Sequence, residues 1–435
     1  MEGHVLRVLQ ADNPWLSGGD LRAWCSLHLP KRFIPRTTLI PDTQPLILVV
    51  GPRQAGKSTL IWHHLASHDK PFLFLNCEEP ALQEWLISPT LVWEDIKGLV
   101  GEPVSLFFEE IQRLPEAGLF LKGMADRKIG VPIYATGSSS FDLESKTRES
   151  LAGRATRRLL LPFCLSEVSQ TKKTTTPVLK NQFREEQLGR MLWAGGYPTA
   201  FLAGDPEREL AALVEAFIIR DASDRFRIKN PVAFRKLLEL AASQIGNLCN
   251  FSHWASITGI SNDTVAEHVS LLEDTHILRL IRPFFGGKRA EIKSAPKVFF
   301  VDNGIRNIFF GGFQPLDTRS DRGQLIENFA FTEIIKVIHP LLDNVRYWRS
   351  KAGAEVDFVI EHRGRLAACE IKAGDPRERI PRSSLSFIEA YQPEIFVIVG
   401  NSEHPARKAG KTLVRFETLS QLAGVIEKWR AEGRS

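Results

Sequence analysis

Gly51-Pro52-Arg53-Gln54-Ala55-Gly56-Lys57-Ser58-Thr59 is the stretch that decides the fold of the N-terminal part of the chain. It matches the pattern Gly-x4-Gly-Lys-Ser/Thr without a mismatch. The apolar run 45–50 before it has the length of a buried strand, and residues 59–65 after it have the pattern of a helix. Backbone N–H groups of such a loop surround a phosphate group, and the following helix N-terminus adds its dipole. The stretch therefore predicts a phosphate-binding site between a strand and a helix.

Each position of this loop has an expected task. Gly51 and Gly56 let the backbone bend where a Cβ atom would clash. Lys57 brings positive charge to the β- and γ-phosphates, and the hydroxyl of Ser58 is placed to ligate Mg²⁺. We expect the whole stretch 51–59 to contact ATP, with Mg²⁺ as its metal. The alternative is a Gly-rich turn that binds nothing, which the flanking strand and helix disfavour.

Length and composition set wide limits. A chain of 435 residues predicts several domains, and its net charge of +5 is too mild to indicate nucleic acid by itself. Its five cysteines are far apart and form no Cys-x-x-Cys pair, which predicts neither a disulfide framework nor a zinc site. A reducing cytoplasm is the expected setting. The N-terminus lacks a signal-peptide pattern and no apolar run reaches about 18 residues, so no membrane span is expected.

Two carboxylates follow a second apolar run. Residues 104–108 end directly in Glu109 and Glu110, as in a Walker B strand. Phosphoryl transfer to water needs one carboxylate near Mg²⁺ and a second that accepts a proton from the attacking water. We assign the first task to Glu109, although Asp is usual there, and the general-base task to Glu110. The alternative is a pair of exposed acids at the end of a strand.

Further polar residues are candidates for contact with the nucleotide. Thr136 and Ser138 follow the apolar run 131–135, and such a strand end lies beside the phosphate loop in an open α/β sheet. Either hydroxyl is expected to sense the γ-phosphate, unless it caps a helix. Arg154 is a candidate cation for the γ-phosphate, within its own chain or toward a neighbouring subunit, and Arg36 is a weaker candidate. A solvated surface arginine is the alternative for both.

Residues 250–269 have the pattern of a helix, a tight turn and a second helix. Gly259 permits the turn and Ser261 caps the second helix. Basic residues then cluster around Gly286-Gly287, as in a phosphate-contacting wing: Arg282, Lys288, Arg289, Lys293 and Lys297. The second helix begins with an acidic surface at Asn262, Asp263 and Glu267, which is unfavourable for reading bases. DNA and a protein therefore both remain candidate partners.

A charged hairpin is expected near the C-terminus. Residues two apart in a strand share a face, so Glu355 and Asp357 should lie on one face and Val356, Phe358 and Ile360 on the other. Glu370 and Lys372 share a face of the return strand. The hairpin is therefore expected to bring Asp357, Glu370 and Lys372 together, with Glu327 on the preceding helix as a further carboxylate.

Two interpretations of this cluster stay open. Two carboxylates hold a divalent metal and a lysine orients or deprotonates water in the Asp…Glu-x-Lys arrangement of restriction-type nucleases. The alternative is an outer sheet face stabilised by cross-strand ion pairs.

Taken in order, these motifs resemble a family of prokaryotic AAA-type P-loop ATPases whose C-terminal domain has no known function. The resemblance runs from about Arg36 to the last strand. It rests on 51–59, Phe-Glu-Glu-Ile-Gln at 108–112, Ala-Thr-Gly-Ser-Ser-Ser at 135–140, Leu-Ala-Gly-Arg at 151–154, Gly-Gly-Tyr-Pro at 195–198, the helix-turn-helix, Glu-Asn-Phe at 327–329, Glu-Val-Asp-Phe at 355–358 and Glu-Ile-Lys at 370–372.

The resemblance implies an α/β fold with a three-layer parallel-sheet core and an extra strand between the P-loop and Walker B strands. It further implies a helical lid that senses the nucleotide through residues 195–198, a winged helix and a restriction-endonuclease-like domain. The usual Asp is replaced by Glu109, which bears on the rate of hydrolysis more than on binding.

We therefore expect an N-terminal extension (1–40), an ATPase core (41–165), a helical lid (166–232), a winged helix-turn-helix (233–298) and a restriction-endonuclease-like domain (299–435). The expected function is an ATP-binding, Mg²⁺-dependent ATP-hydrolysing switch that acts on or with DNA or a protein partner. The sequence leaves the oligomeric state open. Lys57, Glu110 and Arg154 are its expected catalytic residues. The alternatives are an ATP-regulated, metal-dependent nuclease and an ATP-bound interaction protein without enzymatic activity.

Overall fold

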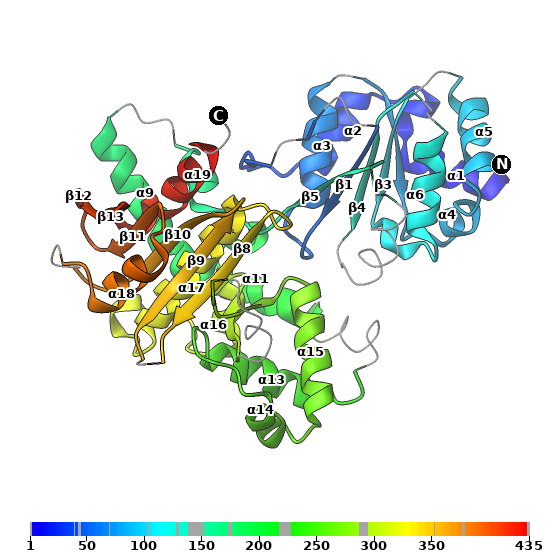
Figure 1. Cartoon of the computed structure of the whole chain (residues 1–435). Coiled ribbons are helices and arrows are strands. Elements are labelled where there is room, and N and C mark those ends of the chain that lie inside the picture. The colour runs from blue at the N-terminus through cyan, green and yellow to red at the C-terminus, as the bar shows by residue number, and fades with distance from the viewer. Residues whose placement is uncertain are drawn as a thin grey trace. The chain divides into compact units, whose positions relative to one another are not determined.

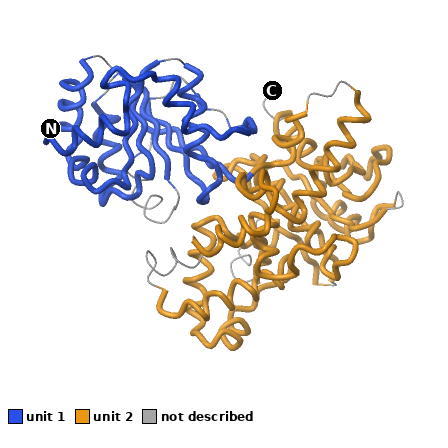
Figure 2. Tube along the Cα trace, turned by 180° about the vertical axis from the view of Figure 1, so that it is seen from behind, with its two compact units in different colours: residues 1–162 blue, residues 163–435 orange. Residues whose placement is uncertain are grey.

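The structure is a computed structural model of the chain. It describes residues 2–38, 40–41, 45–68, 70–101, 104–127, 130–137, 151, 153–172, 176–216, 228–286, 295–351, 353–375 and 379–432. Two compact units make up the chain, unit 1 with residues 1–162 and unit 2 with residues 163–435 (Figure 2). The boundary lies close to the predicted end of the ATPase core, and the finer division into five parts stays a prediction.

The described part of unit 1 is built on a parallel sheet of five strands with the order β2-β3-β4-β1-β5. The strands are β1 (Leu46–Val50), β2 (Phe72–Asn76), β3 (Ser105–Glu109), β4 (Ile133–Gly137) and β5 (Thr156–Leu159). The phosphate-binding stretch follows β1, and the two carboxylates follow or end β3. Strand β4 lies between β1 and β3, as the resemblance implies.

Helices cover both faces of this sheet, which gives three layers (Figure 1). Along β1, Leu46, Leu48 and Val50 face one layer and Ile47 and Val49 face the other, because side chains alternate along a strand. The first layer contains α1 (Gly3–Asp12), α4 (Pro80–Trp85), α5 (Pro89–Val100) and α6 (Ala117–Asp126); the second contains α2 (Leu21–His28) and α3 (Lys57–Ser67). Short 3-10 turns lie at η1 (Pro14–Ser17) and η2 (Ile111–Arg113).

The N-terminal extension is part of this core. Val5, Leu9 and Trp24 are buried against the sheet helices and strands. Asn13 is fully buried, and its amide group pairs with the backbone of Phe74: Phe74 N–H donates to Asn13 Oδ1 at 2.7 Å, and Asn13 Nδ2 donates to the Phe74 carbonyl at 2.9 Å. The extension thereby satisfies backbone groups of the edge strand β2.

The first part of unit 2 is mainly helical. Its elements are α8 (Leu165–Ser169), α9 (Pro177–Ala194), α10 (Pro198–Leu202), α11 (Pro206–Leu213), α13 (Pro231–Ser243), α14 (Phe251–Thr258), α15 (Asn262–Asp274), β6 (Leu278–Ile281), β7 (Lys297–Phe300) and α16 (Asn303–Phe309). Helices α14 and α15 meet at Gly259, whose φ of 74° suits glycine, and Ser261 Oγ accepts the Thr264 N–H at 3.1 Å. Strands β6 and β7 pair antiparallel.

The second part of unit 2 contains, among its described residues, a sheet of six strands with the order β12-β13-β11-β10-β9-β8. Its elements are η5 (Leu316–Thr318), α17 (Arg322–Val337), β8 (Asp343–Arg349), β9 (Glu355–His362), β10 (Arg365–Ile371), α18 (Arg382–Tyr391), β11 (Ile395–Gly400), β12 (His404–Ala409), β13 (Thr412–Thr418), η6 (Leu419–Gln421) and α19 (Leu422–Glu432). Strands β10, β11 and β13 are parallel, whereas β8, β9 and β12 each join antiparallel.

An irregularity in β9 corrects one sequence prediction. The register between β8 and β9 shifts between Arg346 and Trp348. Val356 packs in the hydrophobic cluster that contains Phe387 of α18. The ring of Phe358 instead lies against Phe299 of β7 and Phe331 of α17. Val356 and Phe358 therefore do not share a face, and the simple two-residue alternation was wrong here. An extra residue in a strand re-aims the neighbouring side chains, which sequence periodicity does not reveal.

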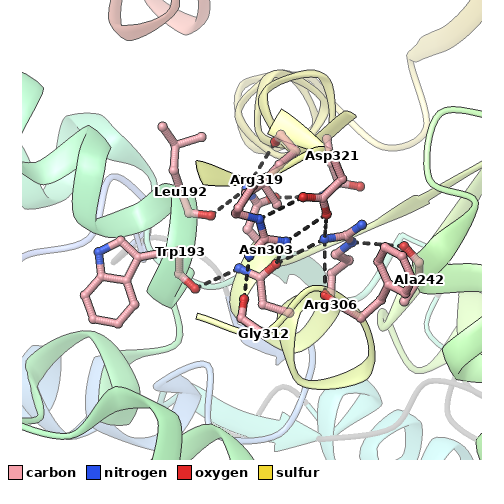
Figure 3. Close-up of polar contacts among 12 residues, drawn as sticks. Leu192, Trp193, Ala242, Asn303, Arg306, Gly312, Arg319 and Asp321 are labelled. Atoms are coloured by element: carbon pink, nitrogen blue, oxygen red, sulfur yellow. Dashed lines mark hydrogen bonds and ion pairs between the residues drawn. The ribbon is translucent and has the colours of Figure 1, made fainter. Parts of the chain in front are cut away.

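A buried network of charges and amides joins the helices of unit 2 (Figure 3). Arg306 is fully buried on α16, donates to the Ala242 carbonyl at 2.9 Å and pairs with Asp321. Arg319 donates to both carboxylate oxygens of Asp321 at 2.8 Å. Asn303 and Asn307 donate to the carbonyls of Leu192 and Trp193 at the end of α9.

Asp321 is the member of this network that becomes protonated at low pH. Burial opposes its charge, but the hydrogen bonds and charges of Arg319 and Arg306 outweigh burial and lower the pKa of Asp321 to about 2. Burial lowers the pKa of Arg306 despite its partner, yet an arginine stays charged throughout the acid range. Only Asp321 therefore titrates there.

Replacing Asp321 by Asn is expected to lower the free energy of unfolding by at least about 2 kcal/mol at pH 7. Because the folded-state pKa lies below the ordinary value of 3.8, the stabilisation is present above about pH 4 and disappears as the pH falls toward about 2. Chemical denaturation of wild type and D321N at several pH values measures this difference. D317N is the matched control, because Asp317 pairs with Arg322 but is 86% exposed. Equal stability of D321N and D317N at pH 7 would contradict the assignment.

Candidate nucleotide site and carboxylate cluster

The phosphate loop has a backbone path that two of its glycines make feasible. A Cβ atom on Gly51 would lie 2.1 Å from the Leu160 carbonyl oxygen, in a residue whose φ is 151°. Gly56 has a φ of 92° and directly precedes Lys57, where α3 begins. Loop, strand β1 and the residue after β5 are therefore in direct contact, and a larger residue at position 51 has no room.

Lys57 lies inside the loop that it serves. Its side chain is buried, and its Nζ donates to the Pro52 carbonyl at 2.8 Å. Burial lowers the pKa of Lys57 to about 8, although Glu110 favours the charged form. Lys57 Nζ is thus hydrogen-bonded to a backbone carbonyl of the loop itself. A phosphate oxygen of a bound nucleotide can replace this carbonyl as the acceptor.

The predicted Mg²⁺ ligands lie together. The side chain of Ser58 is hydrogen-bonded to Glu109, which ends β3, and burial raises the pKa of Glu109. A hydroxyl and a carboxylate in contact supply oxygen ligands of the kind that Mg²⁺ prefers, with phosphate and water completing its coordination. Glu109 thus lies in contact with the serine of the phosphate loop, and the oxygen atoms of these two residues fit the metal.

Glu110 is held in an uncommon backbone conformation. Its φ is 52°, in the left-handed region where a residue other than glycine is strained. Its N–H donates to Thr136 Oγ1 at 3.2 Å, and its Oε2 accepts Gln112 Nε2 at 2.6 Å. Thr136 is fully buried at the end of β4, whereas Ser138 lies outside the described residues. The contact with Gln112 was missed from the sequence, because only the turn η2 brings its amide back to Glu110.

The two candidate arginines have different surroundings. Arg36 donates to the Ala55 carbonyl in the phosphate loop at 2.8 Å and also to the Leu161 carbonyl after β5. The structure therefore places Arg36 against the phosphate loop. Arg154 forms an ion pair with Asp126 at the end of α6. A role of Arg154 at the γ-phosphate stays a prediction.

The Gly-Gly-Tyr-Pro motif packs inside unit 2. A Cβ atom on Gly195 would lie 2.0 Å from the carboxylate of Asp302, and the Gly196 N–H donates to that carboxylate at 2.7 Å. Burial raises the pKa of Asp302, although this hydrogen bond and others oppose it. Gly195 is thus required by a close approach to a buried carboxylate, whereas a Cβ atom on Gly196 would lie 2.5 Å from the Phe163 carbonyl oxygen. Nucleotide sensing by residues 195–198 stays a prediction.

The second predicted site also gathers its residues. Lys372 Nζ donates to Glu370 Oε1 at 2.5 Å, and Asp357 Oδ2 accepts the Ile371 N–H at 2.7 Å. Burial and the charge of Asp357 raise the pKa of Glu327 to about 8 and that of Glu370 to about 7. The structure thus brings Asp357, Glu370, Lys372 and Glu327 together.

Lys297 corrects the predicted basic wing. It is 4% exposed and forms an ion pair with Glu355, and its Nζ lies 3.7 Å from Glu327 Oε1. Instead of facing a nucleic acid, it enters the carboxylate cluster, because it begins the buried strand β7. Lys288, Arg289 and Lys293 lie outside the described residues. The sequence does not predict the burial of Lys297, because a lysine followed by an apolar run also occurs at the exposed end of a strand.

A metal does not fit this cluster as it is arranged. Across the described ranges, no group of three or more His, Cys, Asp or Glu side chains is placed to hold a metal ion. The ammonium of Lys297 lies among the carboxylates instead.

Fold and site together define the class of unit 1 as a P-loop nucleotide-binding α/β core. Residues 43–169 match the family described as AAA domain, which supports an ATP-binding ATPase of the AAA type. Residues 185–315 match one domain of unknown function (DUF8612) and residues 322–419 match another (DUF4143).

The chain is also similar in sequence to three proteins described as uncharacterized. An uncharacterized protein of Mycobacterium tuberculosis and one of Mycobacterium bovis are each 26% identical over 401 residues, which is 91% of this chain and 85% of theirs. An uncharacterized protein of Haemophilus influenzae is 22% identical over 70% of this chain and 78% of its own length.

Among solved structures, a Walker-type ATPase of Pyrococcus abyssi is 17% identical, with a TM-score of 0.38 over 61% of this chain and 91% of that one. The structure of PCH-2 from C. elegans has a TM-score of 0.24 at 16% identity, over 59% of this chain and 68% of that one. At scores this low, neither likeness bears on function. No helix in the described ranges is long and apolar enough to cross a membrane.

Replacing Arg36 by Ala is expected to weaken ATP binding about tenfold, equivalent to about 1.4 kcal/mol. The reason is that the phosphate loop loses the hydrogen bond from the Arg36 guanidinium to the Ala55 carbonyl. Isothermal titration calorimetry with MgATP measures the change. R32A is the control, since Arg32 is exposed in the same segment. Wild-type affinity in a folded R36A variant would show that this hydrogen bond does not position the loop.

Proposed function

We propose that the chain is a Mg²⁺-dependent ATPase that releases ADP and phosphate. The observation that carries this proposal is the position of Glu109 and Glu110 at the end of β3. Glu109 is hydrogen-bonded to Ser58 of the phosphate loop, and Glu110 is fixed by Thr136 and Gln112. A loop that only binds phosphate does not need a second, separately oriented carboxylate.

The proposed catalysis assigns each residue a task. Lys57 leaves the Pro52 carbonyl and contacts the β- and γ-phosphates, while the loop N–H groups hold the β-phosphate. Ser58 and Glu109 hold Mg²⁺, which when bound neutralises charge on the phosphates. Glu110 accepts the proton of the attacking water, and Gln112 and Thr136 limit the motion of Glu110. Arg154 adds positive charge at the γ-phosphate after its ion pair with Asp126 opens.

We further propose that the nucleotide state acts on unit 2 as a switch. The support is the contact of Gly51 with Leu160 and of Arg36 with Leu161, because the chain enters unit 2 at Phe163. Through these contacts, a change in the conformation of the phosphate loop displaces Leu160 and Leu161, which lie just before unit 2. Limited proteolysis with and without ATP tests the switch, and sedimentation velocity under the same conditions measures the oligomeric state. Identical profiles in both states would speak against the switch.

Two variants separate binding from turnover. K57A is expected to lose at least about 100-fold in ATP affinity, because it removes the buried ammonium that is proposed to contact the β- and γ-phosphates. E110Q is expected to keep its affinity within about twofold while turnover falls by about 10²–10⁴-fold. Calorimetry and phosphate release measure the two effects, and E94Q is the control for an exposed carboxylate on α5. Full phosphate release by E110Q would reject the assigned base, and background turnover by the wild type would favour an ATP-bound interaction protein.

The second candidate is an ATP-regulated, metal-dependent nuclease in a winged-helix and restriction-endonuclease-like arrangement. The convergence of Asp357, Glu370 and Lys372 supports it, and the present filling of the cluster by Lys297 opposes a metal step. The DNA contact is proposed for the exposed Arg279 and Arg282, next to α15.

Plasmid and single-stranded DNA, incubated with ATP and Mg²⁺ or Mn²⁺, test this candidate. Cutting by the wild type that D357A abolishes, with exposed D317A as the control, is the result expected of a nuclease. In a binding assay, R279A/R282A is expected to weaken DNA binding and to lower its salt slope by about 2. If no metal supports cutting, the nuclease candidate fails, and unchanged DNA affinity of R279A/R282A excludes these arginines.

A further inference from the structure

Lys297 links two separate sheets of unit 2. It lies on β7, which pairs with β6, while its ion-pair partners lie on other elements: Glu355 begins β9 and Glu327 is on α17. The lysine side chain is only 6% exposed. Its ammonium therefore comes from outside the six-stranded sheet and is buried among carboxylates of that sheet and of α17.

The charges around Lys297 explain why it stays protonated there. Burial lowers the pKa of a lysine, but the charges of Glu327, Glu355 and Asp357 outweigh burial and raise the pKa of Lys297. The second lysine of the cluster, Lys372, is bonded to Glu370 and is 43% exposed. Lys297 is thus the deeper of the two cations.

Two carboxylate oxygens of the cluster retain unused acceptor capacity. Glu370 Oε2 and Glu327 Oε1 are buried, and no hydrogen-bond donor of the described residues reaches them. Glu370 is 5% exposed. The other oxygen of Glu327, Oε2, lies so close to Gly246 that a Cβ atom there would be 2.9 Å from it. Lys297 Nζ lies 3.7 Å from Glu327 Oε1, which is too long for a hydrogen bond, and Lys372 donates only to the other oxygen of Glu370.

We propose that Lys297 is an internal cation that takes the place of a divalent metal in this carboxylate cluster and keeps such metals out while β7 is in its present position. The arrangement combines two facts: oxygen-rich side chains of the kind that bind divalent cations, and the absence, among the described residues, of a group of them placed to hold one. The cluster already contains a cation, which is a side chain of the protein itself.

A plain ion-pair network is the competing explanation. In that case Lys297 only fastens the β6–β7 pair to the six-stranded sheet. Its removal would then leave repelling carboxylates, lower the stability and create no affinity for metal. The two explanations differ in one measurable property, the affinity for a divalent cation in the absence of nucleotide.

The test is Mn²⁺ binding to nucleotide-free full-length protein, followed by electron paramagnetic resonance of free Mn²⁺ and by thermal unfolding with and without Mn²⁺. K297M is expected to bind one Mn²⁺ at least tenfold more tightly than wild type and to melt at a higher temperature in its presence. K336M is the matched control, because Lys336 is equally buried, 6% exposed, and pairs with Glu333 at 3.2 Å. Adding D357N to K297M should remove the new site.

Two results would overturn the proposal: a folded K297M that binds Mn²⁺ no better than wild type, or a wild type that already binds as tightly as K297M. If K297M does not fold, K297Q replaces it in the same assay, and recovery of folding by Mn²⁺ counts in favour. If neither variant folds with or without Mn²⁺, a metal does not replace the ammonium and the proposal is wrong. None of these outcomes depends on ATP turnover or on DNA cleavage.

Discussion

The contact between Gly51 and the Leu160 carbonyl is the constraint on which the nucleotide site depends. It leaves no space for a side chain and joins the start of the phosphate loop to the end of β5. Arg36 adds a second connection, from Ala55 in the loop to Leu161. Because both contacts involve backbone carbonyls next to strands of the sheet, they hold the loop in place without a nucleotide, and a site organised in advance is the condition for effective electrostatic catalysis.

The carboxylates opposite the loop are positioned by a different device. Strand β4 separates β1 from β3 and places the buried hydroxyl of Thr136 beside Glu110. Glu110 accepts a strained backbone conformation there, and Gln112 holds its carboxylate. Strain of this kind costs of order 1 kcal/mol and persists only where surrounding contacts impose it. Its occurrence at the second carboxylate agrees with a task that needs a fixed orientation.

Buried charged side chains connect several elements of unit 2. Asp302 accepts the Gly196 N–H, Arg306 and Arg319 pair with Asp321, and Lys297 lies among the cluster carboxylates. Each arrangement joins elements far apart in the sequence, and breaking one leaves an uncompensated charge in a medium that solvates it poorly. In this protein, buried ion pairs connect elements that are distant in the sequence.

The sequence by itself determined the phosphate loop, its strand and helix, and the paired carboxylates at the end of a strand. These features have a short range: a strand, a turn that needs glycine and a helix N-terminus follow from neighbouring residues. It also predicted correctly that Asp357, Glu370 and Lys372 would lie close together, because adjacent antiparallel strands bring such positions to one place.

Only the tertiary structure decided what those residues contact. The displaced register in β9 placed Val356 and Phe358 in different clusters, and burial of β7 carried Lys297 away from the predicted wing and into the carboxylates. Arg36 and Gln112 gained their positions from contacts across the sheet and through a 3-10 turn. Periodicity records which face a residue is on, but the partner that compensates a buried charge is chosen by elements that meet only after the chain has folded.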